Sequence, residues 1–156
     1  MGKKILIAFD DSENAMRAVE FVAKSFTPGH GITLFSVVLD APAICDLNSP
    51  GLTPYFLSQK AAFCELEDQK KDLVTSAMRE ARELLLKAGF EQKDIAVKIQ
   101  TKKKGVARGI IDEVNSGYDL VALGRRGLSG IKEFFLGSVS QKVLQSAKGV
   151  SVLMVD

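Results

Sequence analysis

Residues 3–12 have the sequence KKILIAFDDS, and this stretch decides the fold. Residues 5–9 form a continuous apolar run, which is typical of a strand buried on both faces of a parallel sheet. From residue 10 to residue 26 the apolar side chains share one helical face and charged side chains occupy the other. A buried strand followed by an amphipathic helix predicts an alternating α/β fold.

The same alternation continues along the chain. We expect further strands at residues 32–39, 95–100, 119–123 and 150–155, and further helices at residues 59–88, 105–116 and 138–147. Residues 40–56 hold three of the four prolines and predict a long loop. In the long helix that follows, Leu66 and Leu73 belong to the expected apolar face, and Gly89 is the expected C-terminal cap. The order predicts one domain, residues 1–156, built on a single open parallel five-stranded sheet with helices on both faces.

Composition excludes several classes of protein. The 156 residues are 46% hydrophobic and 26% charged, enough for one domain with a sizeable core. The net charge of +2 is too small for a dedicated nucleic-acid binder, and no apolar run approaches the roughly 18 residues of a membrane span. With Cys45 and Cys64 expected to be ordinary thiols and only one histidine, His30, neither a disulfide scaffold nor a zinc site is expected. We therefore expect a cytoplasmic protein.

Two strand ends carry residues that favour a ligand site. In an open parallel sheet, ligands bind outside the carboxyl ends of the strands, where the winding reverses. Glycines let an anion approach the backbone, and a helix N-terminus offers unpaired N–H groups. After the fourth strand, a phosphate site can be formed by Gly124, Gly127, Gly137 and the amides of Ser138 and Val139. Arg125 and Arg126 would add positive charge at its rim.

Both strand ends also have a structural interpretation. The glycines can form a simple turn, with Ser138 as a helix N-cap and Gln141 completing a capping box. After the first strand, Asp10 or Asp11 can cap the helix that follows. Capping by Ser138 is compatible with phosphate binding, so both interpretations stay open.

Other sites for phosphate chemistry are excluded by what the strand ends contain. A receiver domain would need an aspartate after the third strand and a lysine after the fifth, where the chain has Gln100-Thr101 and Met154-Val155-Asp156. The first strand is not followed by Gly-x-Gly-x-x-Gly, and the Gly-Lys-Ser/Thr of a Walker A motif does not occur. A nucleotide would therefore have its phosphates held after the fourth strand.

The glycine spacing after the fourth strand, Gly-x2-Gly-x9-Gly-Ser from Gly124, resembles the ATP-binding signature of the universal stress proteins. Residues 120–155 resemble the C-terminal third of that family almost position by position, and residues 3–22 resemble its first strand and helix. Only the loop at residues 41–56 and the early part of the long helix look individual. The resemblance implies a Rossmann-like fold of the adenine-nucleotide-binding type.

This resemblance also implies a set of binding residues. It places Asp10 near the ribose and base, and the backbone of Val38 against the adenine. The phosphate and ribose contacts match Gly124, Gly127, Gly137, Ser138 and Val139, with Arg125 in the gap between the first two glycines. The implied cofactor is ATP with Mg²⁺ or Mn²⁺ held mainly by the phosphates, so we expect no metal ligand and no catalytic residue in the chain.

The resemblance implies an ATP-binding regulator or adaptor in the stress response. It also implies a homodimer through the final strand and an unidentified protein partner, with neither nucleic acid nor membrane bound. The alternatives are a slow ATP hydrolase or phosphotransferase, and a dimeric partner-binding module that needs no nucleotide. An enzyme would need a general base or nucleophile beside the phosphates, and only Asp10 and Asp11 are placed to serve. Lys102, Lys103 and Lys104 either add charge near the site or form a solvated face.

Overall fold

A computed structural model of the chain describes residues 2–9, 13–39, 54–102, 105–125 and 137–156. The strands are β1 (Lys4–Ala8), β2 (Gly31–Leu39), β3 (Ile95–Lys102), β4 (Leu120–Gly124) and β5 (Ser151–Val155). The helices are α1 (Glu13–Ser25), α3 (Pro54–Lys87), α4 (Val106–Val114) and α5 (Ser138–Ser146), with a short 3₁₀ turn, η1 (Gln92–Asp94), before β3. The predicted alternation of strands and helices is confirmed.

The five strands form one parallel sheet in the order β3-β2-β1-β4-β5. From β1 the chain winds outward through β2 to β3, and it then returns to the other side of β1 to form β4 and β5. The winding direction therefore reverses between the neighbouring strands β1 and β4. The predicted single open parallel five-stranded sheet is confirmed.

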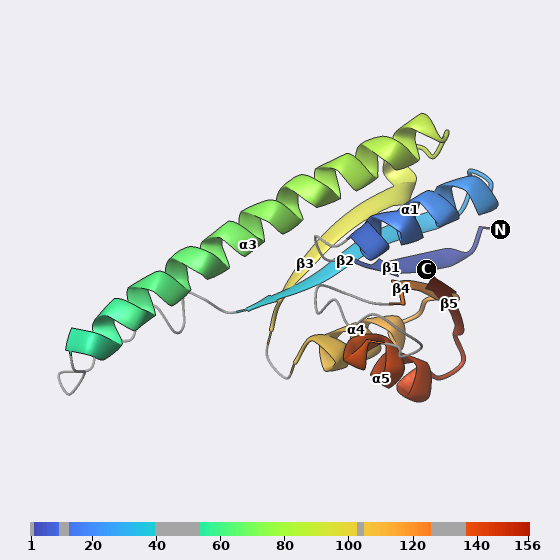
Figure 1. The fold of residues 1–156 in the computed structure, drawn as a ribbon. Coiled ribbons are helices and arrows are strands. Elements are labelled where there is room, and N and C mark those ends of the chain that lie inside the picture. The colour runs from blue at the N-terminus through green and yellow to red at the C-terminus, as the bar shows by residue number, and fades with distance from the viewer. Residues whose placement is uncertain (1, 10–12, 40–53, 103–104, 126–136) are drawn as a thin grey trace.

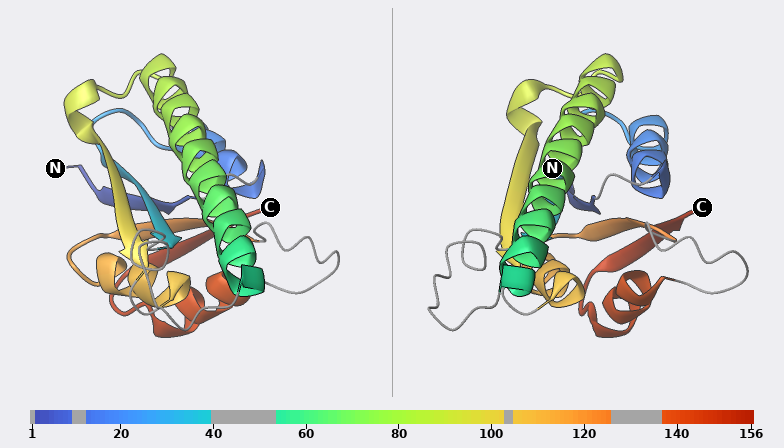
Figure 2. Two further views of the ribbon diagram at one scale, coloured as in Figure 1. Left: turned by 90° about the vertical axis from the view of Figure 1, so that its left-hand side faces the viewer. Right: turned by 60° about the vertical axis from the view of Figure 1, so that its left-hand side comes forward.

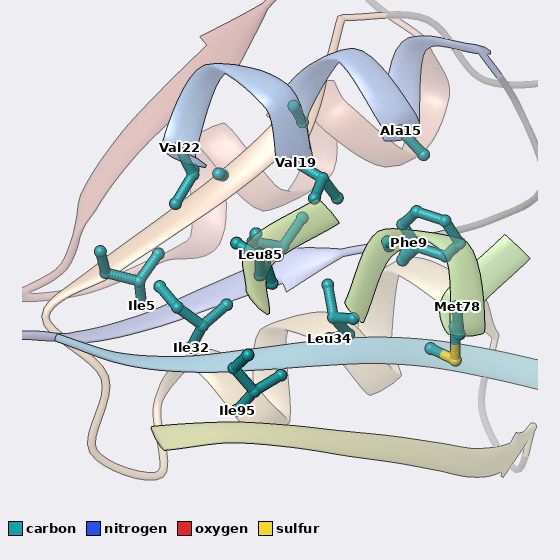
Figure 3. Close-up of a cluster of buried hydrophobic side chains, with 14 of the residues drawn as sticks. Ile5, Phe9, Ala15, Val19, Val22, Ile32, Leu34, Met78, Leu85 and Ile95 are labelled. Atoms are coloured by element: carbon teal, nitrogen blue, oxygen red, sulfur yellow. The ribbon is translucent and has the colours of Figure 1, made fainter. Parts of the chain in front are cut away.

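Helices cover both faces of the sheet, as predicted: α1 and α3 lie on one face and α4 and α5 on the other (Figure 1). Alternate residues of β1 serve the two sides. Ile5 (Figure 3) lies in the core beneath α1 and α3, and Ile7 belongs to the same core. Leu6 and Ala8 belong to the core on the side of α4 and α5. The apolar run at residues 5–9 thus contributes to the core on both faces of the sheet, as predicted.

The buried face of α3 differs from the prediction. Val74, Met78, Ala81 and Leu85 are buried against the sheet, while the predicted core residues Leu66 and Leu73 are 56% and 55% exposed. Leu73 precedes the buried Val74 and points away from the core. For Leu66 the reason is length, because 34 helical residues extend about 50 Å and the nine residues of β2 only about 30 Å. The first half of α3 therefore projects beyond the sheet (Figures 1 and 2).

The ends of α3 also refine the prediction. The helix begins at Pro54, five residues before the expected start, and proline is well suited to a first helical position because its φ is already helical. Gly89 ends it as predicted, with a positive φ of 99° and its N–H donating to the Leu86 carbonyl.

A disulfide corrects the expectation that both cysteines are ordinary thiols. Cys64, in α3, is disulfide-bonded. The chain's other cysteine, Cys45, lies outside the described residues. The sequence alone missed the bond because cysteine spacing does not reveal which thiols meet in the folded chain.

An ion pair links edge strand β3 to α4 and to the segment before β4. The Lys98 ammonium contacts both carboxylate oxygens of Glu113 at 2.8 and 2.7 Å, and the Tyr118 hydroxyl donates to the same carboxylate at 3.0 Å. Burial is the main reason that the pKa of Tyr118 is raised above its usual 10.0. The hydrogen bond to Glu113 is the main reason that the pKa of Lys98 is raised above 10.5.

Both shifts predict a loss of stability in alkali. Each group holds its proton more tightly in the folded chain, so its stabilisation is complete below its ordinary pKa and is lost as pH rises through the folded-state pKa. In a Tyr55→Phe variant, Tyr118 is the single tyrosine, and its ionisation can be followed by ultraviolet absorbance. We expect a midpoint above pH 10 in the folded protein and near 10 in denaturant. A folded-state midpoint at or below the denatured one would contradict the burial of Tyr118.

Candidate functional site

The carboxyl ends of β1 and β4 lie side by side at one edge of the sheet. The two strands are paired in parallel, with Ile5 opposite Leu120 and Ile7 opposite Ala122. This edge is the place where the winding reverses, which is the position of ligand sites in open α/β sheets. The two strand ends selected from the sequence are therefore brought together.

The amino end of α5 is held at the same edge by the end of β4. The Gly137 N–H donates to the Arg125 carbonyl at 2.9 Å, and the Ser140 hydroxyl donates to the Gly124 carbonyl at 2.9 Å. The Gln141 N–H donates to the Gly137 carbonyl, which closes the first helical turn. The backbone N–H groups of Ser138 and Val139, in the first turn of α5, have no acceptor within the helix. The edge therefore combines N–H groups that have no acceptor within their helix with the positive end of a helix dipole.

The predicted capping box at the start of α5 is wrong. Gly137, not Ser138, occupies the N-cap, and no side chain caps the helix there. Ser138 is the first helical residue and its side chain is exposed. The hydrogen bond from Gly137 to Arg125 fixes the helix start one residue earlier than the pattern predicts.

Gly124 has a packing role that the sequence did not reveal. A Cβ at this position would lie 2.8 Å from the backbone carbonyl carbon and 2.9 Å from the carbonyl oxygen of Asn14 in α1. Only a residue without a side chain lets the first turn of α1 pack so closely on the end of β4. This requirement is independent of any ligand.

Arg125 is the most highly connected residue of the site. Its N–H donates to the Val155 carbonyl at 2.8 Å, and its Nη2 lies 3.1 Å from Oδ1 of Asp156. Its Nε is buried and has no hydrogen-bond partner among the described residues. Leaving such a donor unsatisfied costs about 1–3 kcal/mol, so the site holds a cation with an unused donor.

Of the remaining predicted site residues, some lie within the described part of the chain and others fall outside it. Val38 lies near the carboxyl end of β2, opposite Thr101, at the same edge but with β1 between it and β4. The Val139 side chain packs against the core on the side of α4 and α5. Only the backbone N–H of Val139 is therefore a candidate for ligand contact. Asp10 and Gly127 lie outside the described residues, as do Lys103 and Lys104.

The described part of the chain lacks two features that would suggest other functions. No group of three or more histidine, cysteine, aspartate or glutamate side chains within it could hold a metal ion. None of its helices combines the length and the apolar character needed to cross a membrane.

A parallel five-stranded sheet that reverses its winding beside a helix amino end defines a Rossmann-like α/β protein. A model of the universal stress protein family matches residues 1–156, and the chain belongs to that family. The universal stress protein in the QAH/OAS sulfhydrylase 3′ region of Thermus aquaticus is 30% identical to it over 147 residues, which cover 94% of each chain.

Solved structures share the fold. Universal stress protein UspA from Lactobacillus plantarum has a TM-score of 0.70 at 21% identity, with 99% of this chain and 97% of that chain covered. A universal stress protein in complex with cAMP has a TM-score of 0.57 at 22% identity, with 99% and 96% covered. At these identities the likeness is one of fold.

The close approach at Gly124 predicts a stability defect. Gly124→Ala places a methyl group against the Asn14 backbone, which cannot move as a side chain would, and should lower the free energy of unfolding by about 1–3 kcal/mol in urea denaturation. The matched control is Gly31→Ala, because a Cβ at Gly31 would have nothing within 4 Å. Equal stability of the two variants would contradict the packing role of Gly124.

Proposed function

We propose that this protein binds ATP at the carboxyl edge of its sheet and acts as a nucleotide-dependent regulator or adaptor in the stress response. The observation that carries the proposal is the meeting of three features at the winding reversal: the ends of β1 and β4 and the amino end of α5. Family membership supports the role in stress, and a relative of the same fold is known in complex with cAMP.

The described residues suit the triphosphate. The amides of Ser138 and Val139 begin α5 and would donate to phosphate oxygens, favoured by the helix dipole. The Nε of Arg125, which has no hydrogen-bond partner among the described residues, would supply a charged donor. The family resemblance adds Val38 at the adenine. A divalent cation, Mg²⁺ or Mn²⁺, would be held mainly by the phosphates and would neutralise part of their charge.

Assembly through β5 is the second part of the proposal. β5 is an edge strand that pairs with β4 on one side. The Ser151 N–H and the Val155 carbonyl both point to the β4 side, since they bond Asp119 and Arg125. Because successive residues of a strand alternate, the backbone groups of Val152 and Met154 point outward. Such an unpaired edge is a template for pairing with a second copy.

The nucleotide site predicts that Gly137→Val abolishes ATP binding in a folded protein. The backbone angles of Gly137, φ −57° and ψ 154°, suit a β-branched residue, while its side chain would occupy the phosphate space beside Ser138. Titration calorimetry measures the affinity. Gly31→Val is the control, since Gly31 starts β2, where the chain has room for a side chain, and should bind ATP as the wild type does. Unchanged affinity in folded Gly137→Val would refute the site.

The dimer predicts a specific effect of proline at Val152. Val152→Pro removes an outward N–H without removing a bond to β4, and should convert dimer to monomer in analytical ultracentrifugation. Val152→Ala keeps that N–H and should remain dimeric. A wild-type protein that is monomeric at tens of micromolar would overturn the assembly proposal.

A further inference from the structure

The ion pair between Arg125 and Asp156 joins two groups with different surroundings. The Arg125 side chain is 30% exposed and the Asp156 side chain 69% exposed, with 3.1 Å between Nη2 and Oδ1. An exposed carboxylate regains its hydration easily when it leaves such a pair, so pairs of this kind hold together weakly. The backbone of Arg125 is held by hydrogen bonds to Val155 and Gly137, so loss of the pair affects the side chains alone.

The guanidinium of Arg125 is incompletely satisfied in this pair. Nη2 has a carboxylate oxygen, whereas Nε is buried without a hydrogen-bond partner among the described residues. A guanidinium presents its donors as a planar fork, which a phosphate group with several oxygens can accept at two points. A phosphate would therefore satisfy this side chain better than the contact with Asp156 does.

The position of Arg125 brings this cation to the candidate phosphate site. Its carbonyl accepts the Gly137 N–H at the N-cap of α5, and its own N–H is bonded to Val155, the residue before Asp156. One residue is thus in contact with the amino end of α5 and with the end of β5. The backbone of Arg125 thus contacts the amino end of α5 and its side chain contacts Asp156, so a phosphate bound at α5 would lie next to the residue that holds Asp156.

We propose that Arg125 exchanges partners, pairing with Asp156 when the site is empty and with a phosphate of ATP when the site is filled. This inference rests on the proposed ATP site and adds a regulation to it. Asp156 is then an internal competitor of the nucleotide. It lowers the affinity for ATP, and binding of ATP frees the Asp156 side chain from Arg125, while the backbone hydrogen bond from Arg125 to Val155 keeps the end of β5 on β4.

Affinities measured by titration calorimetry with Mg-ATP test the exchange. Asp156→Asn removes the competitor and should tighten binding about twofold to fivefold, the range that corresponds to a weak exposed pair. Arg125→Gln should weaken binding. In the Arg125→Gln background, Asp156→Asn should have a smaller effect than in the wild type, because the contact with Arg125 is then already lost. Asp94→Asn is the charge-matched control: Asp94 precedes β3 at the opposite edge of the sheet, and its loss should leave the affinity unchanged.

Two readouts separate the exchange from a merely structural pair. Adenosine lacks phosphate, so its affinity should be the same in Asp156→Asn and wild type. The NMR signal of the Arg125 Nε–H should shift when Mg-ATP is added and stay in place with adenosine.

The outcomes also separate the two proposals. If the wild type binds no ATP, the nucleotide site and the exchange are both wrong. If the wild type binds ATP but Asp156→Asn binds it equally or more weakly, or if the Arg125 Nε–H signal is unmoved, only the exchange is overturned.

Discussion

The parallel pairing of β1 with β4 is the contact on which the rest of the structure depends. β1 is the central strand, and its side chains from Ile5 to Ile7 are fully buried, so it can form only where both faces are covered. Pairing with β4 on one side and β2 on the other makes the chain wind both ways from one strand. That reversal gives the sheet two faces for helices and one edge where strand ends and the amino end of α5 converge.

Local pattern was enough to predict the order of elements and the parallel sheet. Strand β1 shows why. A short run of five apolar residues fits a buried strand, and the apolar residues that follow recur with the period of a helix. The same reasoning failed on α3 because periodicity identifies an apolar stripe but not how much of it the sheet covers. Leu66 continues the stripe into a part of the helix that projects beyond the sheet, and Leu73, next to the buried Val74, points away from the core.

The site was predictable as a location and less so as a set of contacts. The two strand ends and the helix start that the sequence singled out do meet in the folded chain, and ligand binding there stays a prediction. The N-cap at Gly137, the approach of Asn14 to Gly124 and the pair of Arg125 with Asp156 all depend on residues that meet only in the folded chain. No spacing in the sequence encodes such meetings. Gly124, which the sequence predicted as a phosphate contact, proved to have a role in helix packing.

Because the first half of α3 projects beyond the sheet, local stability differs along this helix. Its last turns share in the core through Val74, Met78, Ala81 and Leu85, so separating them from the sheet requires opening much of the domain. Residues 65–72, exposed for the most part, rely on backbone hydrogen bonds within the helix, and those can open turn by turn. Protection of amide hydrogens against solvent exchange should therefore rise along a single continuous helix, from values typical of an isolated peptide to values set by global unfolding.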